Sequence, residues 1–185
     1  LNSGKRKALF LSLSNSYHGE TIGALSVGDV ELYKDTYQPL LIANMQVPVP
    51  KDQSVEAAKE ALQALEEVLI VKADEIAAFI IEPLIQGAGG MHMYHPAYLS
   101  GARALTQQYG VHLIADEIMT GFGRTGKMFA CDHAEISPDF MTLSKALTGG
   151  YLALSVVMTT LDVYQAFYCD YNEYKAFLHS HSYTG

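Results

Sequence analysis

The sequence predicts an α/β fold, a three-layer αβα sandwich around a mainly parallel sheet. Apolar runs of strand length alternate along the chain with longer segments whose apolar residues recur every three to four positions. Several of the runs are too uniformly apolar for half-exposed strands, which indicates that helices cover both faces of the sheet. No repeat, low-complexity segment or linker divides the 185 residues, so we expect one domain.

Six strands are expected, and each coincides with a short apolar run. They lie at residues 8–12, 45–49, 77–81, 111–115, 140–143 and 154–158. Runs of this length suit strands and are far shorter than the ~20 residues that a membrane-spanning helix needs.

Two helices are expected between these strands. Ser54 begins the first, which extends to about residue 71 and places its apolar residues on one face. Pro96 opens the second, which extends to about residue 109 and ends at Gly110. Together with the strands, these helices complete the alternation that is typical of a parallel sheet.

Composition excludes several classes of protein. The chain has 12 Lys and Arg against 20 Asp and Glu, a net charge of −8, and 49% hydrophobic residues. The high hydrophobic content excludes a disordered chain. The net negative charge means that the chain lacks the basic surface that binding to nucleic acids or anionic membranes requires. Cys131 and Cys169 are the only cysteines; they match neither a disulfide framework nor a zinc site, so we expect a reducing compartment, the cytoplasm.

Polar side chains follow four of the predicted strands. They are Tyr17-His18 after the first strand, Glu82, Asp116 and Lys145. Parallel strands bring their carboxyl ends to one edge of the sheet, where α/β proteins bind ligands. Asp116 and Lys145 form a structural ion pair, are two unrelated charges at strand ends, or make up a chemical site. The small and apolar neighbours of Lys145 favour a nucleophilic amine.

Three other patterns have ordinary interpretations. Residues 121–126 match G-x-G-x-x-G by letter, but they neither follow a strand directly nor open a helix, so a tight connection is favoured over a dinucleotide site. The seven histidines lack metal-ligand spacing, and no metal is expected. The aromatic residues between 164 and 183 form either a subunit interface, which we favour, or a ligand wall.

Four segments, taken in order, resemble the class III pyridoxal-phosphate-dependent aminotransferases. They are Tyr17-His18-Gly19, Glu82-Pro83, Asp116-Glu117 with the glycines of 121–126, and Ser144-Lys145. The resemblance spans essentially the whole chain. It implies the large domain of fold-type I pyridoxal-phosphate enzymes, with residues 1–185 as its central part and with the N-terminal and C-terminal small-domain segments absent.

The resemblance implies a role for individual residues. Lys145 would hold pyridoxal 5'-phosphate covalently, be displaced by the incoming amine and move the substrate proton. Asp116 would keep the pyridine nitrogen protonated. Tyr17 would lie beside the cofactor ring and touch substrate, and Ile118 would pack on the other ring face. Glu82 would belong to the polar network around Asp116.

Further residues match positions that contact ligands in the family. Ser180 falls where substrate is touched, and His181 and Ser182 fall where the cofactor phosphate is bound. The commoner family sequence there is Gly-Pro-Thr, so Ser180 and His181 depart from it. Arg124 is equally a candidate for substrate contact or for an ion pair within its loop.

A narrower resemblance concerns the substrate. Residues 86–91, 93–96, 144–152 and 164–168 resemble the branch of the family that converts 8-amino-7-oxononanoate to 7,8-diaminononanoate in biotin biosynthesis, with S-adenosyl-L-methionine or lysine as amino donor. Another class III ω-amino-acid or diamine aminotransferase is the alternative, as is a non-catalytic truncated fragment. The implied partners are small-molecule substrates and a second copy of the chain, which shares the active site in a homodimer.

Overall fold

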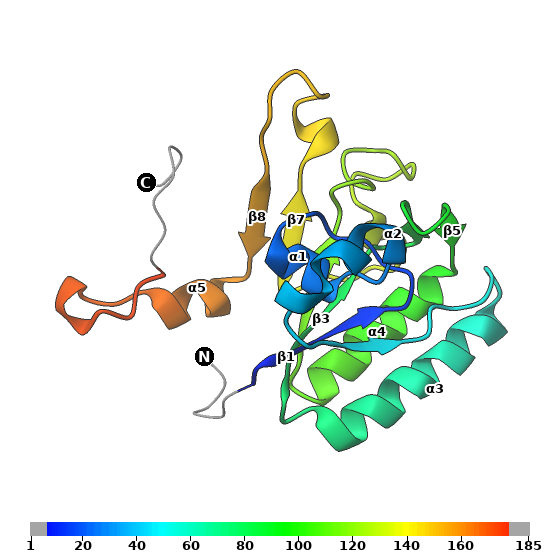
Figure 1. The fold of residues 1–185 in the computed structure, drawn as a ribbon, viewed down its shortest axis with the longest axis horizontal. Coiled ribbons are helices and arrows are strands. Elements are labelled where there is room, and N and C mark those ends of the chain that lie inside the picture. Colours follow the sequence, from blue (N-terminus) through cyan, green and yellow to red (C-terminus); the bar gives the residue numbers. More distant parts are fainter. Residues whose placement is uncertain (1–6, 178–185) are drawn as a thin grey trace.

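A six-stranded sheet forms the centre of the molecule (Figure 1). The structure is a computed structural model that describes residues 7–177. The strand order is β2-β1-β3-β6-β7-β8. Every neighbouring pair is parallel except β7 and β8, which are antiparallel. The predicted α/β fold with a mainly parallel sheet is therefore confirmed.

All six predicted strands are present, with ends shifted by two residues at most. The strands are β1 (Leu9–Leu13), β2 (Met45–Val47), β3 (Ile76–Ile81), β6 (His112–Asp116), β7 (Phe140–Leu143) and β8 (Val156–Thr159). Burial follows the order in the sheet. Five of the six β3 residues are buried, whereas every residue of β8 is exposed. The expectation that helices cover both faces therefore fits the central strands but is wrong for β8.

The two predicted helices pack side by side on one face of the sheet. In α3 (Val55–Lys72), the Ser54 hydroxyl accepts a hydrogen bond from the amide of Ala57 at 3.0 Å and caps the amino terminus. In α4 (Pro96–Gln108), proline occupies the first turn, as predicted. The buried residues of α3 recur every three to four positions and pack into the main core: Ala58, Ala61, Leu65 and Leu69.

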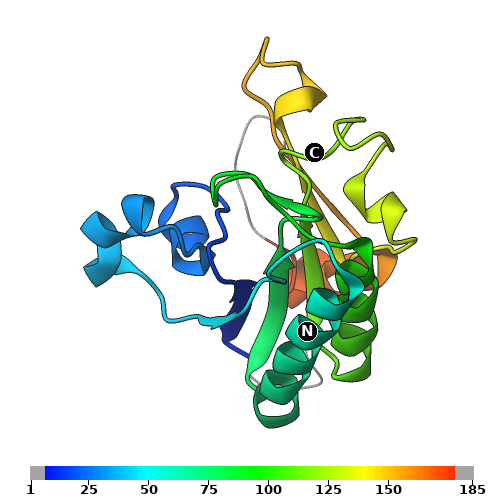
Figure 2. The ribbon, with the colours of Figure 1, turned by 90° about the vertical axis from the view of Figure 1, so that its right-hand side faces the viewer.

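A glycine brings α3 and α4 into close contact. A β-carbon placed on Gly101 of α4 would lie 2.3 Å from Cδ1 of Leu62 on α3. Leu65 of α3 and Leu99 of α4 are both fully buried in the same cluster. Figure 2 shows the two helices together on one side of the strands, with α1 and α2 on the other side.

Smaller elements surround this framework. Short helices α1 (Ile22–Val27) and α2 (Glu31–Lys34) and a 3₁₀ segment η1 (Asp35–Leu40) connect β1 to β2, and a two-stranded hairpin joins β4 (Ile85–Gln86) to β5 (His92–Met93). Three further 3₁₀ turns are η2 (Ala130–His133), η3 (Lys145–Leu147) and η4 (Tyr171–Glu173). None of these was predicted, because elements this short have too few residues to show a hydrophobic period.

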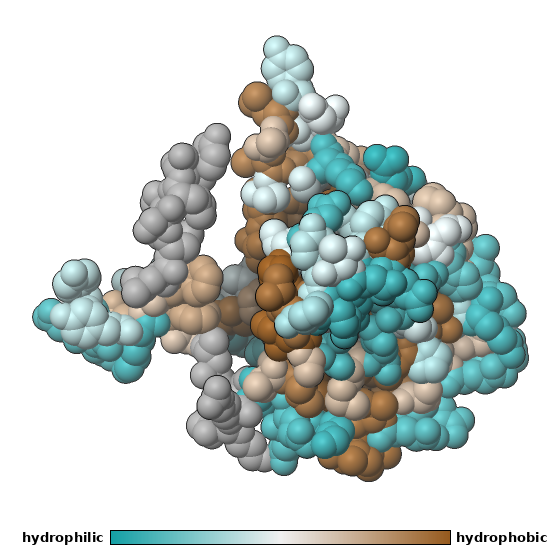
Figure 3. All heavy atoms as spheres, viewed as in Figure 1, coloured by the Kyte–Doolittle hydropathy of each residue, from teal (hydrophilic) through white to brown (hydrophobic). Residues whose placement is uncertain are grey.

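The carboxyl-terminal part of the described chain is the least covered. After β8, helix α5 (Leu161–Phe167) and the residues up to 177 extend away from the sheet (Figure 1). Val157 and Met158 of β8 are 65% and 51% exposed, and Figure 3 shows hydrophobic side chains on the surface over this strand. None of the helices among residues 7–177 is both long enough and apolar enough to span a membrane.

Candidate active site

The predicted polar residues gather at the carboxyl edge of the sheet. β1, β3, β6 and β7 are parallel neighbours, so the segments that follow them emerge on the same side. Tyr17 follows β1, Glu82 comes directly after β3, Asp116 is the last residue of β6, and Lys145 follows β7 after one residue.

Asp116 is held by three hydrogen-bond donors from three segments. Its Oδ1 accepts from the Thr142 hydroxyl on β7 at 3.1 Å and from the backbone amide of Ile118 at 3.2 Å. Its Oδ2 lies 2.7 Å from Nδ1 of His18. The carboxylate is nearly buried, with 6% of the residue exposed. The side chain is therefore fixed in orientation at the strand end.

His18 was expected at this edge, but no contact or role was assigned to it from the sequence. It stands in the Tyr17-His18-Gly19 motif, but its contact with Asp116 joins residues 98 positions apart in the sequence. Only the pairing of β1, β3 and β6 brings the two together. A histidine at a strand end next to a predicted aromatic ligand residue was the signal available in the sequence.

Glu82 ties two loops of the site together. Its Oε1 accepts from the backbone amide of Tyr17 at 2.9 Å, and its Oε2 accepts from that of Gly87 at 3.0 Å. Burial raises the pKa of Glu82, an effect that the two amides and the neighbouring His18 oppose and that the negative charge of Asp116 strengthens. Glu82 therefore binds the segment that carries His18, the neighbour of Asp116, but makes no hydrogen bond to Asp116 itself.

Tyr17 directs its hydroxyl to a neighbouring acid. Its Oη donates to Oε1 of Glu20 at 2.5 Å, and its ring centroid lies 4.9 Å from that of Tyr33. Burial, followed by the hydrogen bond to Glu20, raises the pKa of Tyr17 to about 12. The phenol is therefore protonated at neutral pH, and its half-buried ring borders the site.

Lys145 differs from the prediction. The sequence placed it among small and apolar neighbours that would desolvate its amine, but the structure shows it exposed. The reason is that β7 ends at Leu143 and the chain turns at once into η3, which projects from the sheet edge. Lys145 also has a φ of 36°, in the left-handed region that non-glycine residues rarely adopt. Strain of this kind accumulates at functional sites.

Of the other predicted site residues, two lie in the described part of the chain and three lie outside it. Ile118 is half-buried just beyond Asp116, at the same edge. Arg124 is exposed in the loop after β6, where no hydrogen bond or ion pair joins it to residues 7–177, so the loop ion pair is not formed. Ser180, His181 and Ser182 lie outside the described residues.

A second carboxylate fixes the loop that carries Arg124. Glu117 is fully buried and accepts from the amides of Ala130 at 3.0 Å and Cys131 at 2.8 Å, and from the Thr120 hydroxyl. Burial raises the pKa of the Cys131 thiol, and the nearby Glu117 charge adds to the effect, which disfavours the reactive thiolate form.

The glycine loop itself confirms the interpretation as a tight connection. Gly123 and Gly126 have φ values of 92° and 93°, and Phe122 between them and β6 also has a positive φ. The loop leads into the short turn η2 rather than into the long helix that a dinucleotide site requires.

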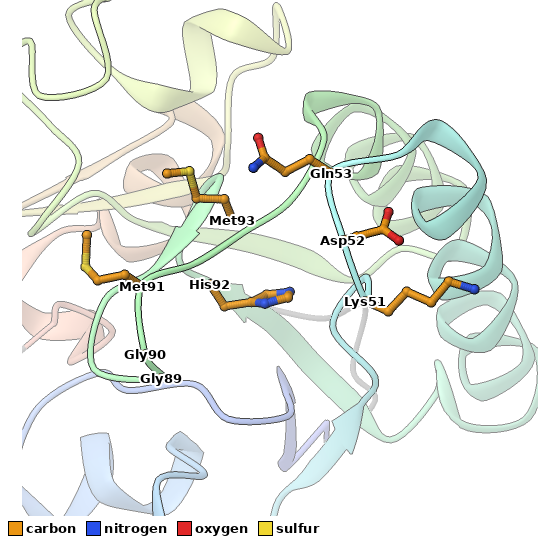
Figure 4. Close-up of a pocket in the computed structure, with 8 residues that line it drawn as sticks. All are labelled: Lys51, Asp52, Gln53, Gly89, Gly90, Met91, His92 and Met93. Atoms are coloured by element: carbon orange, nitrogen blue, oxygen red, sulfur yellow. The ribbon is translucent and has the colours of Figure 1, made fainter.

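An open pocket lies beside this edge, between the loop before α3 and the β4–β5 hairpin (Figure 4). One side is formed by Lys51, Asp52 and Gln53, and the other by residues 89–93. His92 projects across it, and its Nε2 lies 2.6 Å from the carbonyl oxygen of Pro50. No group of three or more His, Cys, Asp or Glu side chains within residues 7–177 is arranged to hold a metal ion.

Comparison with known proteins gives a consistent result. Residues 2–185 match the family described as aminotransferase class III. The chain is 59% identical over its full length to an adenosylmethionine-8-amino-7-oxononanoate aminotransferase of Helicobacter pylori, covering 42% of that protein. It is 46% identical, over 97% of the chain and 41% of the relative, to a protein of the same name from Anoxybacillus flavithermus. The chain thus spans about two fifths of the length of these curated relatives.

Solved structures agree with the sequence comparison. The adenosylmethionine-8-amino-7-oxononanoate aminotransferase of Methanocaldococcus jannaschii superposes with a TM-score of 0.89 at 37% identity, over 98% of this chain and 41% of that one. An amine transaminase from an uncultivated Pseudomonas species, solved in its PLP-bound form, superposes with a TM-score of 0.81 at 32% identity, over 87% of this chain and 38% of that one.

Proposed function

The chain belongs to the class III aminotransferase family, and on that premise we propose that the protein converts 8-amino-7-oxononanoate to 7,8-diaminononanoate in biotin biosynthesis. The observation that carries the proposal is the 59% identity, over the whole chain, with a relative named for that substrate. The proposed amino donor is S-adenosyl-L-methionine, which the names of the relatives contain, with lysine as the other candidate. Residues 1–185 would form the central part of the large domain.

The side chains at the carboxyl edge of the sheet fit pyridoxal phosphate, the cofactor of this family. A carboxylate offers about four lone pairs, and three of those on Asp116 are engaged, which leaves an acceptor for a protonated ring nitrogen. The exposed amine of Lys145 is accessible to an aldehyde. The half-buried side chains of Tyr17 and Ile118 offer surfaces for a flat ring.

Each of the site residues of this chain would have a separate role. Bound pyridoxal phosphate supplies an electron sink for the carbon that loses its proton. Asp116 would hold a proton on the ring nitrogen, and Lys145 would bind the cofactor covalently and then carry the substrate proton. Glu82 would hold the Tyr17 segment against the site. His181 and Ser182 would bind phosphate, and Ser180 and Arg124 would contact substrate.

Replacing the lysine tests whether the protein is a cofactor-dependent enzyme. Lys145→Ala is expected to abolish both the visible absorption band of the cofactor-loaded protein and its aminotransferase activity. Lys59→Ala, which removes another exposed lysine, on helix α3, is the matched control and is expected to retain both. Absence of the band in the unaltered protein would support the non-catalytic alternative instead.

A second candidate function rests on the structural neighbours. An ω-transaminase from Thermomicrobium roseum superposes with a TM-score of 0.80 at 33% identity. Under this second candidate, the protein is a general ω-amino-acid or diamine aminotransferase. Steady-state assays with 8-amino-7-oxononanoate and with an ω-amino acid separate the two candidates. Good activity with the ω-amino acid alone would reject the biotin assignment.

We also propose a homodimer with a shared active site in the cytoplasm. Tyr164, Tyr168 and Tyr171 are 52%, 69% and 87% exposed, and tyrosine is enriched at interfaces between protein chains. Cys131 and Cys169 are free thiols, which suits a reducing compartment. Sedimentation velocity of the protein is expected to give twice the mass of one chain, and a single-chain mass would contradict the dimer.

A further inference from the structure

The β4–β5 hairpin is bound to the segment that leads from β1 to Tyr17. Nε2 of Gln86, which is fully buried, donates to the carbonyl oxygen of Ser14 at 2.9 Å. Nδ2 of Asn15 donates to the carbonyl oxygen of Gly89 at 2.8 Å. Hydrogen bonds at two points of the hairpin therefore fix its position against this segment.

Two glycines bring the hairpin very close to its neighbours. A β-carbon placed on Gly89 would lie 2.4 Å from the backbone oxygen of Asn15, and one placed on Gly87 would lie 2.5 Å from Sδ of Met119. Met119 directly follows Ile118 in the turn after β6. The hairpin thus approaches the segment after β1 at one glycine and the turn after β6 at the other.

The base of the hairpin is tied to the central sheet. The hydroxyl of Tyr94, a residue only 3% exposed, donates to the carbonyl oxygen of Glu82 at 2.5 Å, and the Tyr94 amide donates to the carbonyl oxygen of Leu84 at 3.1 Å. Glu82 comes directly after β3, and its carboxylate accepts from the amide of Gly87 at 3.0 Å. The hairpin is therefore a firmly held extension of β3.

We propose that the β4–β5 hairpin is a spacer that sets the width of the gap between Tyr17 and Ile118, into which the cofactor ring fits. The inference rests on the proposed function, in which these two side chains offer surfaces for the ring. Carbon atoms attract best at about 3.5 to 4.0 Å, and a gap wider by about 0.5 to 1 Å forfeits a quarter to a half of that attraction. Gly87 and Gly89 are positioning residues, because they act on the ring only through Tyr17 and Ile118.

A ligand without an aldehyde tests the width of the gap. Pyridoxamine phosphate carries the ring but does not react with Lys145, so its dissociation constant from the apoprotein reports the fit of the ring. In Gly87→Ala this constant is expected to rise on the order of tenfold, because the methyl group displaces Met119 and with it the turn that carries Ile118. In a Met119→Ala background the methyl group has room, and the same change is expected to cost less than about twofold. Equal effects in the two backgrounds would overturn the inference.

Two further variants provide the control and a milder change. A β-carbon on Gly23 would meet no atom of residues 7–177 within 4 Å, so Gly23→Ala is expected to leave the dissociation constant unchanged. Asn15→Gly covers the case in which Gly87→Ala does not fold. It removes the hydrogen bond to Gly89, and glycine readily adopts the φ of 60° found at this position. The constant is expected to rise about threefold in Asn15→Gly, and an unchanged value would overturn the inference.

Visible circular dichroism of bound pyridoxal phosphate separates positioning from general destabilisation. The dichroism per bound cofactor depends on how the ring is held, whereas a loss of stability lowers only the amount that is bound. We expect it to change in Gly87→Ala and Asn15→Gly and to stay constant in Gly23→Ala. Unchanged dichroism in both hairpin variants would overturn the inference. If the unaltered protein binds neither ligand, the proposed function fails instead, so the two failures are distinguished.

Discussion

Asp139, on the amino-terminal side of the sheet, is anchored by three hydrogen bonds. Its two oxygens accept from the Arg103 guanidinium at 2.6 and 3.2 Å, and one of them also accepts from the amide of Leu113 at 2.7 Å. Burial opposes the charged form, but the hydrogen bonds and charge of Arg103 together with that amide prevail and lower the pKa of Asp139. The interaction joins α4 to the starts of β6 and β7.

Replacing Asp139 with asparagine is expected to destabilise the protein by about 1 to 3 kcal/mol at neutral pH, because hydrogen bonds to a charged group are lost and Arg103 keeps an unpaired charge. Urea unfolding measures the difference. Glu60→Gln is the control, because the side chains of the Lys51–Glu60 pair are 65% and 64% exposed, so solvent screens the pair and its loss should change the stability far less.

The pH dependence of this effect has a defined sign. A lowered folded-state pKa means that the contribution of Asp139 is fully present above the unfolded value, about 3.9, and is lost as pH falls through the folded value. The difference between the unaltered protein and Asp139→Asn should therefore shrink below about pH 4. A difference that grows in acid would contradict this account.

At the scale of elements, the close approach of α3 and α4 depends on Gly101. Gly101→Ala places a methyl group against Leu62, whose side-chain end can move, and gains about 1 kcal/mol of helix propensity, so the net change should be small. Gly101→Val adds a branched side chain and is expected to cost about 1 to 3 kcal/mol. Thermal and urea unfolding measure both. Leu62→Ala should relieve most of the valine penalty, and additive effects of the two changes would contradict the contact.

Long elements were predictable from the sequence and short ones were not. Ser54 and Pro96 mark the starts of α3 and α4, and the predicted strand at residues 140–143 matches β7 at both ends. The β4–β5 hairpin escaped prediction because strands of two residues carry no alternation. β8 was expected to be covered because its sequence is apolar, but coverage depends on neighbours that a single strand does not encode.

The site was predictable in its positions but not in its contacts. Topology alone brings Glu82, Asp116 and Lys145 to one edge, because parallel strands end together. The contact between His18 and Asp116 depends on how three strands pair, and the exposure of Lys145 depends on where the chain turns after β7. Neither property is encoded in local composition.

At the scale of the whole molecule, the exposed surface over β8 is expected to govern association. In the described sheet β8 is an edge strand, and its apolar side chains are exposed. The isolated 185-residue chain is therefore expected to self-associate through this strand. Val157→Lys should weaken that association by at least about tenfold, because burying an ammonium group costs more than about 1.4 kcal/mol. Concentration-dependent sedimentation velocity measures it.

Gln63→Lys is the matched control for this substitution. It adds the same charge at an exposed position of α3, on the helical side of the sheet, and should leave self-association unchanged. If both variants reduce association equally, net charge rather than the β8 surface controls it.

The left-handed backbone at Lys145 has a consequence for how the site can be lost by mutation. Any residue with a β-carbon keeps the strain, which costs about 1 to 3 kcal/mol, whereas glycine adopts a φ of 36° without penalty. Lys145→Gly should therefore give a protein that is more stable than Lys145→Ala. Selection for stability therefore does not maintain a lysine at this position. It is maintained only where selection for activity outweighs the stability that a change to glycine would add.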